Sequence, residues 1–201
     1  MVRMAKARVE PLQFEEWSEE QKGLLGPQIK EMQKGRGHPD AIFNVIKTVI
    51  RHTKLFKRWS VFANHVMFGS TLDPREREIA ILRIGWLRNA EYEWAQHVVI
   101  GKNCGMTDEE IDWVAEGPQA KGWSELDSAI MQATDELAAD AFITDETFAR
   151  LAAHYSTEQI MDLVFAVGQY NMVSMALNTL GVQLDDGLEG FGKRAPKPQV
   201  A

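Results

Sequence analysis

Two ionisable residues stand four positions apart in the segment RNAEYEWAQH, residues 88–97. If this segment is helical, Glu93 and His97 lie on one face, because side chains at i and i+4 stack along a helix. Apolar residues flank them, so an unpaired charge there would be costly. A carboxylate beside an imidazole can fix its tautomer and tune its pKa, as general acid–base catalysis requires.

A third acid is expected to point into the same interior. Glu78 shares a helical stripe with Ile81, Leu82 and Gly85 on the preceding predicted helix. The arginines of that helix are expected elsewhere: Arg75, Arg77 and Arg83. The alternative is a surface pair of Glu93 and His97, with Glu78 meeting an arginine. Spacing alone does not decide between them.

Composition limits the classes of function. A chain of 201 residues with 45% hydrophobic content can bury a full core, and its length favours one domain. The net charge of −7 provides no basic field for nucleic-acid phosphates. The N-terminus lacks the apolar stretch of a signal peptide, and no run of about 20 apolar residues indicates a membrane span. We therefore expect a cytoplasmic protein that binds neither nucleic acid nor membrane.

The single cysteine limits redox chemistry. Cys104 can form neither an internal disulfide nor a CxxC pair. A buried cysteine at a helix end is usually a small core residue, and this is the interpretation we adopt.

The local signals predict an all-α fold. Capping residues precede apolar periodic segments, and no sustained period-two alternation indicates strands. Asp73-Pro74 predicts a helix from Pro74 to about Arg88, with Asn89 capping the next helix up to Asn103 or Cys104. Further helix starts are predicted at Ser18, Asp40, Thr53, Thr107, Ser124, Thr144 and Thr157, the last running to Leu180.

Three parts of the chain are distinguished. Residues 1–40 are expected to be an N-terminal extension with short helices, and residues 41–186 a helical domain. Residues 187–201, rich in glycine, proline and basic residues, are expected to be a flexible tail.

The motifs REREIAILR and AEYEW, followed by His97, resemble the core of the carboxymuconolactone decarboxylase family. The resemblance extends over FANHVMFGS before them and GQYNMVSMALNTLGVQL after them, covering roughly residues 43–184. It implies the all-α helical bundle that this family shares with alkylhydroperoxidase D.

The peroxidase branch of that family uses a CxxC pair, a histidine four residues beyond it and a glutamate twelve residues before it. His97 and Glu78 match the last two, but Ala90 and Glu93 occupy the cysteine positions. Thiol peroxidase chemistry needs one thiolate to attack and a second to resolve. The resemblance therefore implies a member without that machinery.

The decarboxylase branch suits the residues that remain. Resemblance to it implies a cofactor-independent carboxy-lyase, or a related lyase or isomerase, acting on a small carboxylated lactone or ring acid. We assign His97 as proton donor, Glu93 as the group that orients it and Glu78 as support, with the first two roles exchangeable. No metal is expected, because di-iron helical sites use Glu-x-x-His at i, i+3.

Two further residues are candidates for substrate contact. His65 could line the pocket or only make a structural contact, and Trp94 could form a wall of the pocket or belong to the core. The resemblance also implies a homo-oligomer, a trimer or hexamer. Two alternative functions remain, a peroxiredoxin-like antioxidant protein of the same superfamily and a non-catalytic oligomeric ligand binder.

Overall fold

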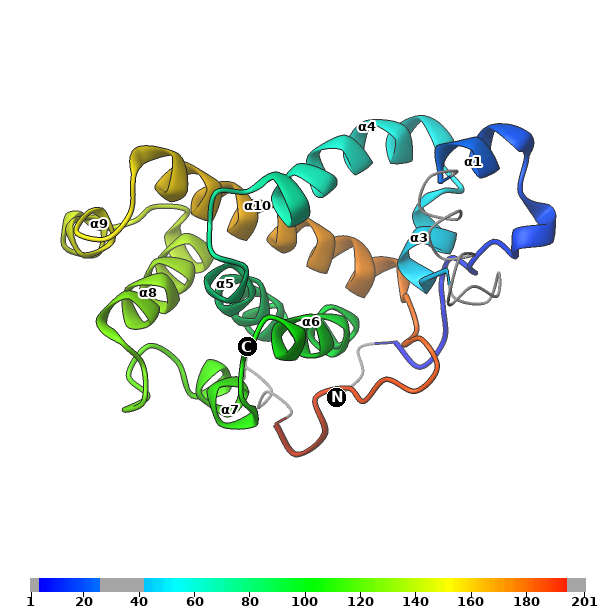
Figure 1. The fold of residues 1–201 in the computed structure, drawn as a ribbon. Helices are drawn as coiled ribbons and strands as arrows, with labels where there is room; N and C mark the ends of the chain where they lie inside the picture. Colours follow the sequence, from blue (N-terminus) through cyan, green and yellow to red (C-terminus); the bar gives the residue numbers. More distant parts are fainter. Residues whose placement is uncertain (1–3, 26–41, 195–201) are drawn as a thin grey trace.

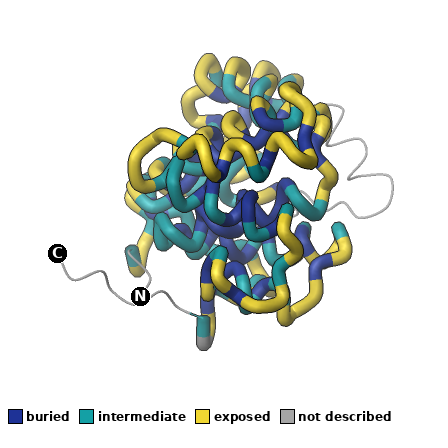
Figure 2. The backbone as a smooth tube through the Cα atoms, turned by 90° about the vertical axis from the view of Figure 1, so that its left-hand side faces the viewer, coloured by how far each residue is buried: buried dark blue, intermediate teal, exposed yellow. Residues whose placement is uncertain are grey.

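Helix α5, Pro74–Leu87, forms the centre of the fold (Figure 1). Every residue from Arg77 to Gly85 is buried, and the helix contacts α6, α7, α8 and α10. A helix buried on all sides needs no polar face, which explains why its apolar residues do not form a single stripe. Figure 2 shows the buried backbone in the middle of the molecule and exposed residues on the outer turns.

The computed structural model describes residues 4–25 and 42–194. In these residues there are helices and turns but no strand, which confirms the all-α prediction. Besides α5 the α-helices are α1 (Glu19–Leu24), α3 (Asn44–Val49), α4 (Thr53–Asn64), α6 (Glu91–Asn103), α7 (Asp108–Glu116), α8 (Glu125–Asp140), α9 (Asp145–Ala152) and α10 (Thr157–Leu180). The 3-10 turns are η1 (Phe14–Glu16) and η4 (Gly192–Arg194), and a π-helical turn, η3, covers His65–Gly69.

The predicted helix starts rest on local hydrogen bonds. Asp73 accepts from the Arg75 backbone N–H, and Thr107 with Glu110 forms a complete capping box. The prediction for Asn89 is wrong. Ala90 is the N-cap residue of α6, and Asn89 has a φ of 51°, a left-handed conformation that asparagine tolerates better than most residues. The predicted cap Asp40 lies outside the described residues.

The helix predicted to start at Thr53 changes type before its end. The α-helix stops at Asn64, and the π-helical turn η3 follows. Asp162 on α10 holds the segment after this turn, accepting from the Thr71 backbone N–H at 2.6 Å and from the Ser70 hydroxyl at 3.3 Å. These contacts attach η3 to the long helix.

Helix α10 has the length and apolar composition of a membrane span, but half of the relevant window is buried. It contacts α5, α6, α8, α9 and η3, as core helices of globular proteins do. Gly181 ends it with a φ of 70°, in agreement with the predicted stop.

The two ends of the described chain pack on the domain. Trp17 and Leu25 join Ile50 and Phe56 in a small hydrophobic cluster separate from the main core. Phe191 is buried against Trp86 and Trp94, within the segment expected to be a tail. The division at residues 40 and 186 stays a prediction.

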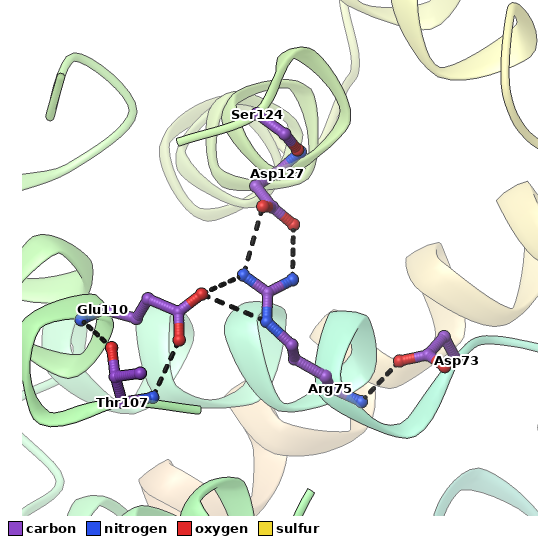
Figure 3. A network of polar contacts seen from close by, with 6 residues as sticks. All are labelled: Asp73, Arg75, Thr107, Glu110, Ser124 and Asp127. Atoms are coloured by element: carbon purple, nitrogen blue, oxygen red, sulfur yellow. Dashed lines mark hydrogen bonds and ion pairs between the residues drawn. The ribbon is translucent and has the colours of Figure 1, made fainter. Parts of the chain in front are cut away.

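An ionic network joins α5 to α7 and α8 (Figure 3). Arg75 donates to Glu110 and to both oxygens of Asp127, at 2.9 and 3.1 Å for the latter. Glu110 in turn caps α7 by accepting from the Thr107 backbone N–H at 2.7 Å. The network fixes three helices around the centre of the fold.

Candidate functional site

Helices α5 and α6 bring Glu78, Glu93 and His97 into one buried cluster. Their exposed fractions are 0%, 4% and 5%. His97 Nδ1 lies 2.5 Å from Glu78 Oε2, and His97 Nε2 lies 2.9 Å from Glu93 Oε1. The prediction that the three share one interior is confirmed, and the alternative of a surface pair is wrong.

Glycines allow the two helices to approach at this cluster. A Cβ on Gly85 would meet Glu93 Cγ at 3.5 Å, and one on Gly101 would meet Met106 Sδ at 2.9 Å and Glu78 Cβ at 3.7 Å. A Cβ at position 101 would therefore displace the Met106 side chain, while its distance to Glu78 Cβ is an ordinary van der Waals contact.

Arg77 belongs to the cluster, contrary to its expected placement elsewhere. Its side chain is buried and donates to Glu78 Oε1 from Nη2 at 3.0 Å and from Nε at 3.2 Å. Consecutive side chains on a helix diverge, so the spacing of Arg77 and Glu78 did not predict the contact. The long arginine side chain nevertheless reaches the neighbouring carboxylate. Each oxygen of Glu78 thus faces one cation.

The electrostatics make His97 an imidazolium. Burial alone would lower its pKa, but Glu78 and Glu93 outweigh burial and raise the pKa of His97 to about 10. Both ring N–H groups then point at carboxylates. With Arg77, the cluster holds two positive and two negative charges in a buried space.

A cavity of about 360 Å³ lies beside Glu93 and His97. Most of its wall is apolar and comes from α3, α4, η3, α6 and α10; it includes Ile46, Trp59, Met67, Phe68, Ile100 and Val173. Glu78 does not line it, and the second oxygen of Glu93 makes no hydrogen bond with any described residue. Glu93 and His97 both line the space where a ligand fits, and of the two only Glu93 has an oxygen without a hydrogen-bond partner among the described residues.

The other polar residues that line the cavity were missed in the sequence: Asn64, Tyr92, Gln96, Gln169 and Tyr170. The Tyr170 ring packs edge-on against His97 with centroids 4.8 Å apart, and its hydroxyl lies 2.7 Å from Met67 Sδ. Burial, with Glu93 and Glu78 adding to it, raises the pKa of Tyr170 well above its ordinary value. Residues 169 and 170 belong to an apolar helix far along the chain, so no local pattern linked them to Glu93.

The predicted substrate contacts do not reach this cavity. His65 is half-exposed and lies 3.4 Å from Asp162 Oδ1. Trp94 is 1% exposed and packs with Trp86 and Phe191 in the core. Neither residue is among those that line the cavity, and a role in substrate contact stays a prediction for both.

The cysteine is separate from the cavity wall. Cys104 is the C-cap residue of α6, and burial, followed by the charge of Glu78, raises the pKa of its thiol. The positions of a CxxC pair hold Ala90 and Glu93, as the sequence shows. No set of three or more His, Cys, Asp and Glu side chains within residues 4–25 and 42–194 is arranged to hold a metal ion.

Comparison of sequences matches residues 53–136 to the carboxymuconolactone decarboxylase family. No curated protein sequence matches the chain. Similar folds occur among solved structures. One is an alkylhydroperoxidase AhpD core, an uncharacterized peroxidase-related protein from Ralstonia eutropha JMP134, with 18% identity, a TM-score of 0.70 and coverage of 80% of this chain and 84% of that one.

Two other similar structures cover 90% of this chain and 94% of their own. The first is an uncharacterized peroxidase-related protein from Silicibacter sp. TM1040, with 14% identity and a TM-score of 0.73. The second is a cysteine-to-alanine variant of the debrominase Bmp8 in complex with 2,3,4-tribromopyrrole, with 17% identity and a TM-score of 0.70. At these identities the likeness establishes the alkylhydroperoxidase D-like fold.

Proposed function

We propose that the chain, whose residues 53–136 match the carboxymuconolactone decarboxylase family and which has a single cysteine and so no CxxC pair, is a cofactor-independent lyase or isomerase of the cytoplasm. Its substrate is a small ring compound, and its chemistry is proton transfer. The carboxylated lactone implied by the sequence resemblance is one form of this substrate.

One observation carries the proposal, the buried Glu78–His97–Glu93 relay that ends at an apolar cavity. Both Glu93 and His97 line the cavity, but His97 has both nitrogens occupied by carboxylates, whereas one oxygen of Glu93 is unused. This geometry favours the exchanged roles, with Glu93 meeting the substrate and His97 supplying or storing the proton behind it. Glu78 and Arg77 balance the charge on His97.

In a decarboxylation the bond between the ring and the carboxylate carbon breaks, and its electron pair moves through the ring double bond to the carbonyl oxygen. Carbon dioxide leaves, and a remote ring carbon then takes up a proton. Glu93 can deliver this proton after receiving it from His97, and solvent restores it to the relay. In an isomerisation Glu93 removes a proton from one carbon and returns it to another. A poorly solvated apolar cavity favours both reactions.

The small-ring class has support from one structural neighbour. The debrominase Bmp8 variant was solved with 2,3,4-tribromopyrrole, a single five-membered ring. A cavity of about 360 Å³ lies at the lower end of the size range of ligand sites, about 300–1,000 Å³.

The test is incubation in deuterium oxide with two panels, carboxylated unsaturated lactones and neutral cyclic ketones. Nuclear magnetic resonance follows deuterium entering ring carbons, and released carbon dioxide is measured in parallel. We expect enzyme-dependent deuterium incorporation that the Glu93→Gln variant loses. Ligand binding without exchange or carbon dioxide release by any compound would instead favour the non-catalytic binder.

The proposal includes a homo-oligomer. Helix α10 exposes an apolar stripe at helical spacing, consisting of Met161, Val164, Phe165, Met172 and Met175. A second copy of the chain would cover this surface, in accord with the trimer or hexamer expected from the resemblance. Size-exclusion chromatography with light scattering should give a mass that is a multiple of 22.7 kDa. A monomer at micromolar concentration would contradict it.

A further inference from the structure

Gln169 is a buried polar residue whose hydrogen-bonding capacity is unused. Its exposed fraction is 4%, it lines the cavity, and its Oε1 has no hydrogen-bond partner among the described residues. A buried carbonyl without a partner costs about 1–3 kcal/mol. A ligand that supplies the partner would remove this cost.

Several other hydrogen-bonding groups of the cavity are already engaged, whereas the Asn64 side-chain amide and the Trp59 indole N–H make no hydrogen bond with a described residue. The Tyr92 hydroxyl donates to Asp185 Oδ2 at 2.5 Å, and Gln96 Nε2 donates to the same oxygen at 2.5 Å. The Tyr170 hydroxyl is directed at Met67 Sδ. Gln169 Oε1 and the second oxygen of Glu93 remain as acceptors, and Gln169 Nε2, which makes no hydrogen bond with a described residue, remains as a donor.

The cavity wall carries no lysine or arginine among the described residues. Its one cation, His97, is held by two carboxylates and has no free N–H. A ligand carboxylate would therefore lie near the negative charge of Glu93 without a counter-charge of its own. Burying such a charge is costly.

We propose that the cavity selects an uncharged ring compound bearing a hydroxyl group, and that Gln169 is its specificity-determining contact. A hydroxyl both donates and accepts, so it can pair with the side-chain amide in either orientation. The apolar ring then packs against the remaining wall. The inference rests on the proposed function in placing the substrate in this cavity, and it narrows the substrate class to neutral hydroxylated rings. Because such a ring has no carboxylate to lose, the inference favours the isomerase form of the proposed function over the decarboxylase form.

Matched small ligands test the inference by binding alone. The probes are 4-methylphenol, 4-methylbenzoate and toluene, titrated at neutral pH with isothermal calorimetry and with the fluorescence of Trp59, which lines the cavity. Wild-type protein should bind 4-methylphenol roughly 10-fold more tightly than 4-methylbenzoate. Equal or tighter binding of the benzoate, or no binding of the phenol, would overturn the inference.

Two variants, Gln169→Leu and Gln169→Met, remove the amide and keep an apolar side chain of similar size. Each should weaken binding of 4-methylphenol roughly 3- to 10-fold, the effect of one neutral hydrogen bond, and leave toluene binding unchanged. The ligand-free variants should melt at a higher temperature, because the unpartnered carbonyl is gone. Unchanged affinity for 4-methylphenol in both variants would refute the role of Gln169.

Ser174→Ala is the matched control. Ser174 lies on the same helix, is fully buried and also has an unpartnered oxygen, but it is not among the residues that line the cavity. This variant should gain stability without losing affinity for 4-methylphenol. Binding is measured without turnover, so the two proposals can fail separately. If the predicted affinities are observed but no substrate is turned over, the inference about Gln169 is supported and the proposed enzyme function is contradicted.

Discussion

Helix α5 carries two ionic networks with different roles, one at Arg75 and the other three residues later at Glu78. The Arg75 network joins three helices, and both oxygens of Glu110 and of Asp127 accept hydrogen bonds (Figure 3). The Glu78 network is more deeply buried and ends at a cavity, where one oxygen of Glu93 is unused. Residue types alone do not distinguish them.

The difference lies in hydrogen-bond saturation and access. Burial alone would raise the pKa of Glu110, but the Thr107 backbone and Arg75 outweigh it and lower that pKa. A saturated carboxylate of this kind has no capacity left for a ligand. In the second network an imidazolium stands behind a carboxylate that faces open space. We infer that an unused acceptor beside a cavity, rather than a cluster of charges, marks the reactive site.

The largest expected effect is loss of activity at the cavity end of the relay. Glu93→Gln keeps the shape of the side chain but cannot accept a proton near neutral pH, so turnover of an identified substrate should fall about 10²–10⁴-fold. Steady-state kinetics on the folded variant measures it. The matched control is Glu110→Gln in the saturated network, which should keep turnover. Equal losses in the two variants would remove the distinction between the networks.

The next effect is a pH dependence of stability. The folded-state pKa of His97, about 10, lies above the ordinary value of 6.5. Protonated His97 therefore stabilises the fold fully below about pH 6.5, and this stabilisation is lost as the pH rises toward 10. Between about pH 6.5 and 8.5 the loss should be roughly 2 kcal/mol in the free energy of unfolding.

Urea titrations across that range, for wild type and His97→Gln, measure this loss. The variant should be less stable at pH 6.5, and its stability should change less with pH. The pKa values of Tyr92 and Tyr170 are raised, so these tyrosines stay protonated across this pH range and do not contribute to the change in stability. Parallel curves for the two proteins would mean that His97 is not an imidazolium between two carboxylates.

A smaller effect is expected when the structural network is broken. Arg75→Ala leaves Glu110 and the buried Asp127 without their shared cation. Because the Glu110 side chain is partly solvated and water can enter the space that Arg75 leaves, the destabilisation should be about 1–2 kcal/mol. The melting temperature should fall by roughly 2–8 °C. Turnover at a temperature where the variant is folded should be unchanged. A large loss of activity there would show that the two networks are coupled through α5.

The sequence predicted those features that depend on neighbours along the chain. Asp73, Thr107 and Gly181 set helix ends through local hydrogen bonds or backbone conformation, and these predictions are confirmed. The contact predicted from the i, i+4 spacing of Glu93 and His97 is also confirmed, because it depends only on helix geometry.

Features that depend on distant contacts were not predicted. The π-helical turn after Asn64 is attached to Asp162, and Gln169 meets Glu93 at the cavity only through tertiary packing. Trp94 packs against Phe191 rather than lining the cavity, and these two residues are 97 positions apart in the chain. Helical periodicity gives the face of a side chain but not the element that covers it.

The smallest expected effect is that of replacing Cys104. This substitution tests whether the reactive group lies at the cavity or is the thiol. Cys104→Ser should leave turnover unchanged and alter the free energy of unfolding by about 0.5 kcal/mol or less. The thiol is on the C-cap of α6, outside the cavity wall, and its raised pKa keeps it protonated and weakly nucleophilic at neutral pH. Consumption of an alkyl hydroperoxide with a dithiol reductant should stay at background in wild type and variant alike. Rapid consumption lost in Cys104→Ser but kept in Glu93→Gln would place the reactive group at the thiol, and the unused oxygen of Glu93 would then no longer mark the site.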